Sequence, residues 1–264
     1  MFSHNKSKQL LIIVPAYNEA GAIRQVVCGV HYVVPHADIL VIDDCSTDQT
    51  LQEAVRAGAF VVRHPYNLCI GGTFQTGLKF AQMQGYEQVV RIDGDGQHDP
   101  NDIPYILSAL QPEQADVAIC SRFLETKSTM HIPWARRIGI FFFSQITSLL
   151  TGQKVTDPTS GFMGLNRRAI NLLAVFMPQD YPEVENRVIL HKAGLKVVEI
   201  PTCMHDRTAG VSSINSWRSL YYALKVSIAV LICAIKAIPV VSEDELLQEK
   251  TIQYQSLQTI VPEN

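Results

Sequence analysis

Near its start the chain reads Leu10-Leu11-Ile12-Ile13-Val14-Pro15-Ala16-Tyr17-Asn18-Glu19, an apolar run that stops at a proline and then turns polar. An unbroken apolar run of this length, bounded by proline, favours a strand buried on both faces. Apolar residues then recur at helical spacing, at Ile23, Val26, Val27 and Val30. The stretch therefore predicts a buried strand, a polar loop and an amphipathic helix.

The same cycle repeats through the first half of the chain. Apolar runs predict further strands at 39–42, 60–62, 89–92 and 117–120, and helical spacing predicts helices around 51–55, 73–83 and 103–110. Strands that alternate with helices predict βαβ units and a mainly parallel sheet. We expect a doubly wound α/β fold, in which ligands bind beyond the carboxyl ends of the strands.

Composition excludes several classes of protein. The chain has 264 residues, 47% of them hydrophobic, so it is long enough to bury a core and is not disordered as a whole. A formal charge of −3 without a Lys/Arg run argues against nucleic acid as a partner. Six scattered cysteines without a C-x-x-C pair predict neither a zinc site nor a disulfide framework. The polar segment 1–9 does not resemble a signal peptide, so we expect a cytoplasmic protein.

Two of the predicted strands end in clustered carboxylates. The strand at 39–42 runs into Asp43 and Asp44, and the strand at 89–92 runs into Asp93 and Asp95. Four carboxylates at one edge of a sheet would repel one another without a counter-charge, so we expect a cation there. Oxygen ligands of this kind suit Mg²⁺ or Mn²⁺ bound together with a diphosphate.

Simpler interpretations of these loops remain open. Asp43 to Asp48 is also typical of a turn followed by a helix cap from Ser46 or Thr47, and D-x-D alone is typical of a solvated turn. An EF-hand is excluded, because His98 and Pro104 stand where its glycine and glutamate belong. No P-loop and no G-x-G-x-x-G dinucleotide motif occurs.

The order of three motifs narrows the choice. P-A-Y-N-E from Pro15, V-I-D-D-C-S-T-D from Val41 and R-I-D-G-D-G-Q-H from Arg91, in a βαβ frame, resemble the family 2 glycosyltransferases of the GT-A fold. The segments at 64–77, 157–162, 181–183, 198–201 and 207–212 are similar to the dolichyl-phosphate mannosyltransferase-like branch of that family. The resemblance covers roughly residues 10 to 235.

The resemblance implies a donor site. It implies that Pro15, Tyr17, Glu19 and Asp44 contact the nucleoside of a nucleotide-diphospho-sugar. Asp43 would support these residues without contacting the ligand. Asp93, Asp95 and Gln97 match the metal-binding D-x-D-x-Q motif, in which Mg²⁺ or Mn²⁺ bridges the diphosphate; Asp93 thereby also belongs to the nucleotide-sugar site and Asp95 to catalysis. Such a cation stabilises the negative charge that develops on the leaving diphosphate.

The resemblance also implies an acceptor site. Arg122 matches a position that binds the donor, while Arg136, Arg207 and Ser212 match positions for the phosphate of a lipid acceptor; Arg207 is also a catalytic candidate. Arginine suits phosphate because its guanidinium binds in a bidentate manner.

A general base is needed only by a hydroxyl acceptor. Direct displacement inverts the anomeric carbon, and a neutral hydroxyl would require a base, for which Glu183 is the first candidate and Asp180 the second. A polyprenyl phosphate is already anionic and needs none, so Glu183 is equally consistent with a structural residue at a helix start.

Departures from the family pattern affect the loops. Cys45, Cys69 and Thr73 replace residues that are usually Gly, Asn or Ala, and a cysteine at position 69 would be strained if φ is positive there. Ser213 stands where the mannosyltransferase branch has lysine, which weakens the assignment of a polyprenyl phosphate.

Two segments of the second half bear on the membrane. Residues 138–153 are uncharged and contain three consecutive phenylalanines, and residues 220–238 are apolar except for Lys225 and Lys236. Both suit amphipathic helices at a membrane surface, and equally helices that pack on the sheet or in a homo-oligomer. We expect one transferase domain at 10–238, with a donor half at 10–125 and an acceptor half at 126–238, between a polar N-terminus (1–9) and a polar acidic tail (239–264).

The sequence thus predicts a metal-dependent, inverting glycosyltransferase. It would move a hexose from a GDP- or UDP-sugar to a polyprenyl-phosphate or glycan acceptor in cell-envelope synthesis, at the inner face of the cytoplasmic membrane. Two rivals stay open. A sugar-phosphate nucleotidyltransferase would need a glycine-rich basic loop after the first strand, and a non-catalytic nucleotide-sugar or lipid-head-group binding protein would not need D-x-D-x-Q.

Overall fold

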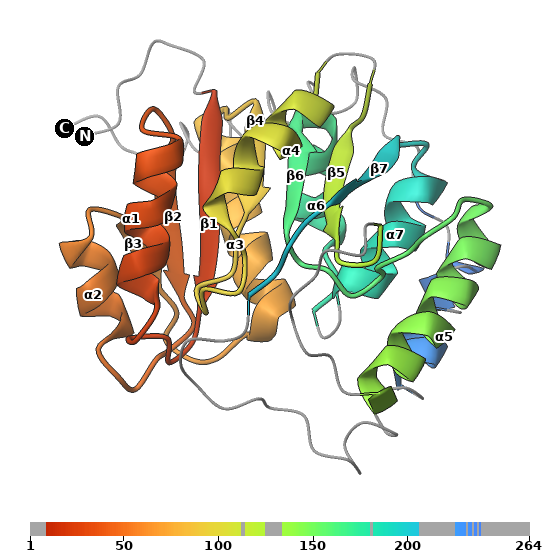
Figure 1. Ribbon diagram of the computed structural model, residues 1–264, viewed down its shortest axis with the longest axis horizontal. Helices are drawn as coiled ribbons and strands as arrows, with labels where there is room; N and C mark the ends of the chain where they lie inside the picture. Colours follow the sequence, from red (N-terminus) through yellow and green to blue (C-terminus); the bar gives the residue numbers. More distant parts are fainter. Residues whose placement is uncertain are drawn as a thin grey trace, which may run out of the picture.

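The computed structural model describes residues 9–111, 114–124, 134–179, 182–205, 225–230, 232–233, 235–236 and 238. Figure 1 shows one sheet with helices on both faces. In chain order the elements are β1 (Leu10–Ala16), α1 (Ile23–Val33), β2 (Asp38–Asp43), α2 (Thr50–Arg56), β3 (Phe60–Arg63), α3 (Cys69–Gln84), β4 (Gln88–Arg91), a 3₁₀ turn (Pro100–Asp102), α4 (Ile103–Ala109), β5 (Val117–Ser121), α5 (Trp134–Thr151), β6 (Met163–Asn166), α6 (Arg167–Phe176), α7 (Pro182–Lys192) and β7 (Val197–Pro201).

The sheet confirms the doubly wound α/β prediction. Its strand order is β3-β2-β1-β4-β6-β5-β7. The neighbours β1–β2, β1–β4, β2–β3 and β5–β7 are parallel, and β6 runs antiparallel to both β4 and β5. The first half of the chain therefore delivers the carboxyl ends of β2, β1 and β4 side by side, which is where the sequence placed a ligand site.

Two apolar clusters hold the layers together. On one face of the sheet Ile13, Ile42 and Val89 pack with residues of α3, α6 and α7, and on the other face Ile12 and Val41 pack with residues of α1 and α4. Alternating side chains of each buried strand thus serve both clusters. The strand at 60–62 differs from the expectation of burial on both faces, because β3 is the edge strand and its side chains are largely exposed.

Helix α3 approaches β1 closely because Gly77 has no side chain. A Cβ at this position would lie 2.7 Å from Ile13 Cγ2, closer than real atoms approach. Glycine costs helix stability, and here it permits the close contact between α3 and β1 at Ile13.

Helix α5 covers the end of the molecule that is remote from β3 (Figure 1). Its inner face carries Ile140 and Phe143, both buried, together with Ser144, Thr147 and Thr151, whose hydroxyls bond to backbone carbonyl oxygens. Its outer face is apolar but exposed: Trp134 is 76% exposed, Phe141 66% and Leu149 84%. The segment predicted at 138–153 is therefore a helix that packs on the domain and leaves a second apolar face uncovered within the described residues.

Candidate active site

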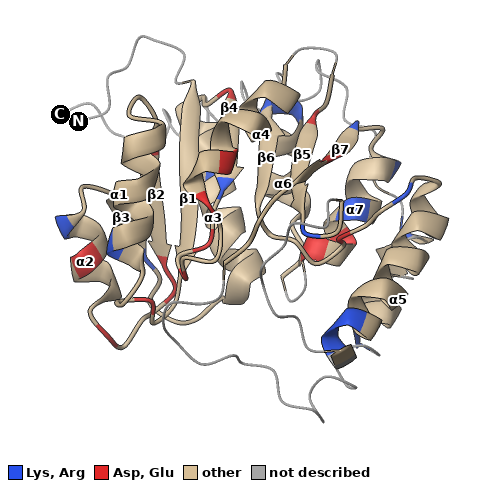
Figure 2. Ribbon diagram, in the orientation of Figure 1, with Lys and Arg blue, Asp and Glu red and all other residues tan. Residues whose placement is uncertain are grey.

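Carboxylates gather where the ends of β2 and β4 flank β1. Asp43 ends β2 and Asp44 follows it, and Asp93 and Asp95 lie two and four residues beyond β4. Backbone bonds tie the loops together, since Gly94 N donates to Pro15 O at 3.2 Å and Asp44 N donates to Ala16 O at 2.9 Å. Figure 2 shows acidic residues along the loops below β1 and β2. The loops that carry the four carboxylates thus lie side by side at one edge of the sheet.

The loop after β1 is held by the loop after β2. Asn18 adopts the left-handed region with φ of 56°, its N–H donates to Ser46 Oγ at 2.9 Å, and its Oδ1 accepts from Thr47 N at 2.8 Å. Glu19 N donates to Thr50 Oγ1 at 2.8 Å. These bonds leave Tyr17, half exposed, at the surface of the loop. The P-A-Y-N-E segment is therefore a fixed platform at the edge of the sheet.

The expected helix cap from Ser46 or Thr47 was wrong. The N-cap residue of α2 is Gln49, which makes no side-chain cap bond; Asp48 instead ties the loop to the start of the helix, because its Oδ1 accepts from Thr50 N at 2.9 Å and its Oδ2 from Ala20 N at 3.2 Å. Burial alone would raise the pKa of Asp48, but these hydrogen bonds outweigh it and hold the pKa below 3.8. Ser46 Oγ instead accepts a hydrogen bond from Asn18 N, so this segment also holds the loop after β1.

Asp44 is buried and oriented through one oxygen. Its Oδ1 lies 2.8 Å from His64 Nδ1 and accepts from Leu68 N at 2.8 Å. His64 is itself fixed on its other side, where Nε2 lies 3.0 Å from Thr76 Oγ1. Among the described residues only Oδ1 of Asp44 receives hydrogen bonds, so Oδ2 keeps its accepting capacity. Asp43 is turned the other way, with Oδ1 accepting from Ser46 N at 3.1 Å and Oδ2 lying 3.5 Å from Arg63 Nε.

The D-x-D-x-Q segment presents oxygen donors. Asp95 is buried and its Oδ1 accepts from Gln97 N at 3.0 Å, while Gln97 Nε2 donates to His205 O at 3.3 Å, so the amide oxygen is directed elsewhere. His98 braces the loop: its Nδ1 accepts from Asp93 N at 3.1 Å and its ring stacks on Phe162. Burial lowers the pKa of His98, which keeps the ring neutral and able to accept.

This donor set fits a hard divalent cation. Two carboxylates and an amide oxygen are the ligand types that Mg²⁺ and Mn²⁺ take, with the remaining positions left to water and phosphate. In the described part of the chain no group of three or more His, Cys, Asp and Glu side chains gathers around one point. The residues present would therefore hold a cation only in part and leave positions for a ligand.

Two of the three departures named in these loops have backbone consequences. Cys45 and Cys69 have φ of 65° and 60°, in the region that favours glycine. Cys69 N donates to Asn67 Oδ1 at 3.0 Å, and Cys45 Sγ lies 3.5 Å from Pro65 O. The loop over Asp44 is thus held in a costly conformation by its own hydrogen bonds.

The remaining predicted residues, which were assigned to the donor, to the acceptor or to base catalysis, divide into described and undescribed positions. Arg122 is buried against Asp157, with Nε and Nη2 at 2.7 and 2.8 Å from the two carboxylate oxygens, and it also donates to Thr159 Oγ1. Arg136 lies in the first turn of α5. Glu183 lies in the first turn of α7, where Arg91 Nη1 donates to its Oε1 at 3.0 Å. Asp180, Arg207 and Ser212 lie outside the described residues.

Three residues in these contacts had been given no role: Arg91, His64 and Asp157. Each stands inside a motif that the sequence had singled out: Arg91 in R-I-D-G-D-G-Q-H, His64 in H-P-Y-N and Asp157 in D-P-T-S-G-F. A charged residue at the end of an apolar strand, as Arg91 is, was the available signal, because burying an arginine requires a partner.

Comparison with known proteins decides the family. The model of the family described as "Glycosyl transferase family 2" matches residues 11–173. An uncharacterized protein of Methanocaldococcus jannaschii is 32% identical over 219 residues, which cover 81% of this chain and 90% of that protein. The chain belongs to glycosyl transferase family 2.

Two further relatives place this glycosyltransferase more closely. It is 27% identical to the undecaprenyl-phosphate mannosyltransferase of Micrococcus luteus over 78% of this chain and 88% of that one, which supports the dolichyl-phosphate mannosyltransferase-like branch. The crystal structure of Mycobacterium tuberculosis glucosyl-3-phosphoglycerate synthase with Mn²⁺, UDP and glucosyl-3-phosphoglycerate superposes with a TM-score of 0.66, at 20% identity over 88% of this chain and 81% of that one. The GT-A fold expected from the sequence is thereby confirmed.

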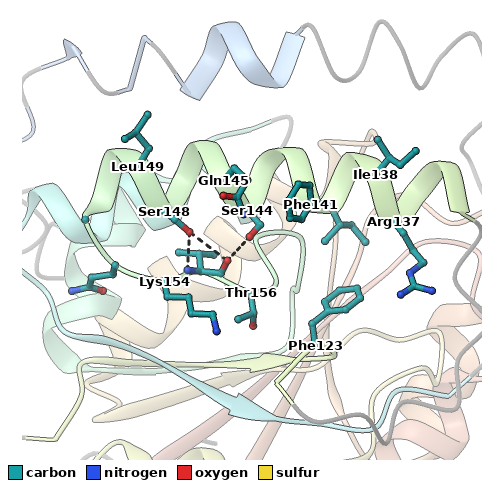
Figure 3. Close-up of a pocket in the computed structure, with 14 residues that line it drawn as sticks. Phe123, Arg137, Ile138, Phe141, Ser144, Gln145, Ser148, Leu149, Lys154 and Thr156 are labelled. Atoms are coloured by element: carbon teal, nitrogen blue, oxygen red, sulfur yellow. Dashed lines mark hydrogen bonds between the residues drawn. The ribbon is translucent and has the colours of Figure 1, made fainter.

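The transferase also has an open groove under α5 (Figure 3). The groove has a volume of about 990 Å³ and runs between α5, the end of β5 and the loop at 152–156. Phe123, Ile140 and Val155 contribute apolar surface, and Phe141 and Leu149 of the exposed face of α5 border the groove as well. The figure shows the cations Arg137 and Lys154 reaching into it from α5 and from the loop. None of the described lining residues is acidic, so the groove suits an apolar ligand that carries negative charge.

No described helix is both long enough and apolar enough to cross a membrane.

Proposed function

We propose that this protein transfers a hexose from a nucleotide-diphospho-sugar, a GDP- or UDP-sugar, to a polyprenyl phosphate, with inversion at the anomeric carbon and with Mg²⁺ or Mn²⁺ as cofactor. The observation that carries the proposal is the set of oxygen donors at the ends of β2 and β4, beside the platform after β1. The two rival functions receive no comparable support, because the match is to a family of glycosyl transferases.

In this proposal the nucleoside lies against the platform. Pro15, Tyr17 and Glu19 contact the base and ribose, and Asp44 accepts a hydrogen bond through Oδ2. The fixed Oδ1 supports this role, because a carboxylate held by His64 and Leu68 N presents its other oxygen in one direction. A ligand then loses little entropy of protein groups on binding.

The diphosphate lies beside D-x-D-x-Q. Asp93, Asp95 and Gln97 would hold the cation, and a bound Mg²⁺ or Mn²⁺ would offset the charge that develops on the leaving diphosphate. Relatedness supports the cofactor, since a neighbour of the same fold was crystallised with Mn²⁺ and UDP. Arg122, held by Asp157, would add positive charge.

The acceptor phosphate approaches from the side of α5. A phosphate oxygen attacks without losing a proton, so no general base is required. Arg136, Arg207 and Ser212 would contact that phosphate, and the groove with Arg137 and Lys154 suits the start of an isoprenoid chain. The name of the Micrococcus luteus relative supports this acceptor. We accordingly propose that residues 10–125 serve the donor and residues 126–238 the acceptor.

A lipid-linked acceptor would require contact with a membrane surface. The outer face of α5 suits this contact, because Trp134, Phe141 and Leu149 are exposed and Arg136 and Arg137 lie at one end of the helix. A cation next to an apolar face is typical of helices that lie in the headgroup region. We propose a peripheral protein at the cytoplasmic face of the membrane.

The reaction can be tested with the full chain in detergent. Radiolabelled UDP- and GDP-hexoses are incubated with undecaprenyl phosphate and Mn²⁺, and the label that enters the organic phase is counted. We expect transfer from one of the donors, and a loss of about 10²- to 10³-fold in rate for Asp95→Asn.

Asp99→Asn is the matched control for this variant. It removes one negative charge from the same loop, yet asparagine can still accept from Asn101 N as Asp99 does, so the rate should stay near wild type. Full activity of Asp95→Asn would contradict the metal assignment. Transfer to an oligosaccharide but not to undecaprenyl phosphate would contradict the acceptor, and label that stays aqueous with every donor and acceptor would contradict the function itself.

A further inference from the structure

Arg91 is a buried cation that joins two distant motifs. It ends β4, its side chain is 2% exposed, and it lies on the face of the sheet covered by α3, with its guanidinium 5.4 Å from the centre of the Phe74 ring. Nε donates to Asp93 Oδ1 at 3.0 Å and Nη2 lies 3.5 Å from Asp93 Oδ2. Nη1 donates to Glu183 Oε1 at 3.0 Å.

Two carboxylates keep Arg91 charged. Burial alone would lower the pKa of Arg91, but the charges of Asp93 and Glu183 raise it above its usual value, so the guanidinium stays charged. One cation faces two carboxylates, and Asp95 lies two residues beyond Asp93. Burying an arginine costs free energy unless its N–H groups have partners. Here the guanidinium bonds to Asp93 on one side and to Glu183 on the other.

The chain makes room for this side chain at a third segment. A Cβ at Gly161 would lie 2.5 Å from Arg91 Nη2, so a residue larger than glycine would displace the guanidinium. Gly161 belongs to the D-P-T-S-G-F segment, whose Asp157 holds Arg122. Arg91 is therefore seated where the metal motif, the segment at 157–162 and the start of α7 meet.

Glu183 is directed at this cation. Its Oε1 takes the hydrogen bond from Arg91, and its side chain is only 17% exposed. A general base needs a carboxylate that reaches the proton of the acceptor. The geometry favours a counter-charge for Arg91, which is a different role from the two that the sequence left open for Glu183.

We propose that Arg91 is a positioning residue for the metal-binding carboxylate, and that Glu183 acts through Arg91. The guanidinium fixes the Asp93 carboxylate in the orientation from which it binds the cation of the donor complex, and Glu183 fixes the guanidinium. The inference rests on the proposed function, because it assigns this pair to the metal site of the same reaction.

The test measures Mn²⁺ binding directly. Free Mn²⁺ is titrated by electron paramagnetic resonance in the presence of UDP or GDP, with wild type, Arg91→Met, Arg91→Lys and Glu183→Gln, and melting curves report whether each variant is folded. Loss of a residue that orients a metal ligand typically weakens metal affinity about 10- to 100-fold, which we expect for Arg91→Met, with partial recovery in Arg91→Lys.

The direction of the change in Mn²⁺ affinity distinguishes an Arg91 that positions Asp93 from an Arg91 that only competes with the cation for it. If Arg91 only competed with the cation for Asp93, its removal would tighten Mn²⁺ binding. An unchanged or tighter affinity in a folded Arg91→Met would therefore overturn the proposal. Where Arg91→Met does not fold, Arg91→Lys and Glu183→Gln decide in the same way, since both should weaken Mn²⁺ binding.

Glu183→Gln separates the counter-charge role from base catalysis. We expect weaker Mn²⁺ binding and, at saturating Mn²⁺, a pH profile of kcat of unchanged shape. A loss of kcat of about 10²-fold or more, with unaltered Mn²⁺ affinity and a lost ionisation in the pH profile, would identify a general base and overturn the proposal. Failure of the proposed function is seen separately, as a wild type that binds no Mn²⁺ with either diphosphate and transfers no hexose, and it would remove the inference with it.

Discussion

Two regions of the molecule differ in how their side chains are held before a ligand binds. One is the acidic edge, formed by the loops after β1, β2 and β4, and the other is the outer side of α5 with its groove. At the acidic edge the polar side chains already have partners: Asp44 is held by His64, and Asp93 by Arg91. At α5 the described residues leave an apolar face and two cations, Arg137 and Lys154, exposed (Figures 2 and 3).

The difference follows from what each region has to bind. A polar ligand is recognised by direction, so orienting carboxylates beforehand lowers the cost of binding. An apolar chain or a lipid surface is recognised by area, which needs exposure and little orientation. Rigid polar partners should therefore matter most at the acidic edge and least on the outer face of α5.

The largest effect is expected at the boundary between the two regions, where Arg122 and Asp157 pair. Both side chains are buried, so Arg122→Met leaves an uncompensated carboxylate and should lower the free energy of unfolding by about 3–5 kcal/mol. Arg56→Met is the control, because Arg56 pairs with Glu53 across one turn of α2 and is 61% exposed, and its loss should cost about 1 kcal/mol or less. Urea unfolding measures both variants. Equal losses in the free energy of unfolding would contradict the expected difference between the buried pair and the exposed pair.

The same pair predicts a pH dependence. Burial alone would raise the pKa of Asp157, but the hydrogen bonds and charge of Arg122 outweigh it and hold the pKa below 3.8. A carboxyl group with a lowered pKa in the folded state adds stability above its unfolded pKa, and this stability is lost as the pH falls through the folded value. Wild type should therefore lose stability more steeply than Asp157→Asn as the pH falls below about 4. Parallel curves would show that folding does not lower the pKa of Asp157.

His64 should give an intermediate effect, confined to the donor. His64→Ala removes a hydrogen-bond partner of the Asp44 carboxylate, a contact of about 1.5–3 kcal/mol, and should raise the donor KM about tenfold or more while kcat changes little. His64→Asn should restore part of the affinity, since its amide nitrogen can replace Nδ1. His36→Asn, at an exposed position, is the control. A fall in kcat with an unchanged KM would mean that His64 does not act through donor binding.

These two regions also differ in how far the sequence predicted them. The acidic edge was predicted because its residues follow strands directly, so Asp43, Asp44, Asp93 and Asp95 come together once the sheet is parallel. Their partners were not predicted: Arg91 and Glu183 are 92 residues apart, and Arg122 and Asp157 are 35 apart. Contacts over such separations depend on how the layers pack, which periodicity does not report.

The reversed strand β6 was missed for a local reason. Met163–Asn166 has four residues and contains Gly164, so it lacks the apolar run that marked the other strands. Gly164 is required by packing, because a Cβ there would lie 2.2 Å from Ile106 Cγ2. Its neighbours β4 and β5 were both expected, yet nothing in the sequence indicated that an antiparallel strand separates them.

The smallest effect on stability is expected on the outer face of α5. Phe141→Ser and Leu149→Ser change exposed side chains and should alter the free energy of unfolding by no more than about 0.5 kcal/mol. The same variants should bind less to vesicles that contain anionic lipid, because each side chain buried in the headgroup region contributes on the order of 1.5–3 kcal/mol. Flotation of the full chain with such vesicles measures the binding, and Tyr105→Ser on α4, 67% exposed, is the matched control.

Three outcomes would contradict this prediction. If the wild type does not float but forms a dimer, and both variants are monomeric, this face of α5 binds a second copy of the chain. Equal flotation of all variants would place the lipid contact elsewhere, and a large loss of stability would mean that α5 is held as rigidly as the acidic edge.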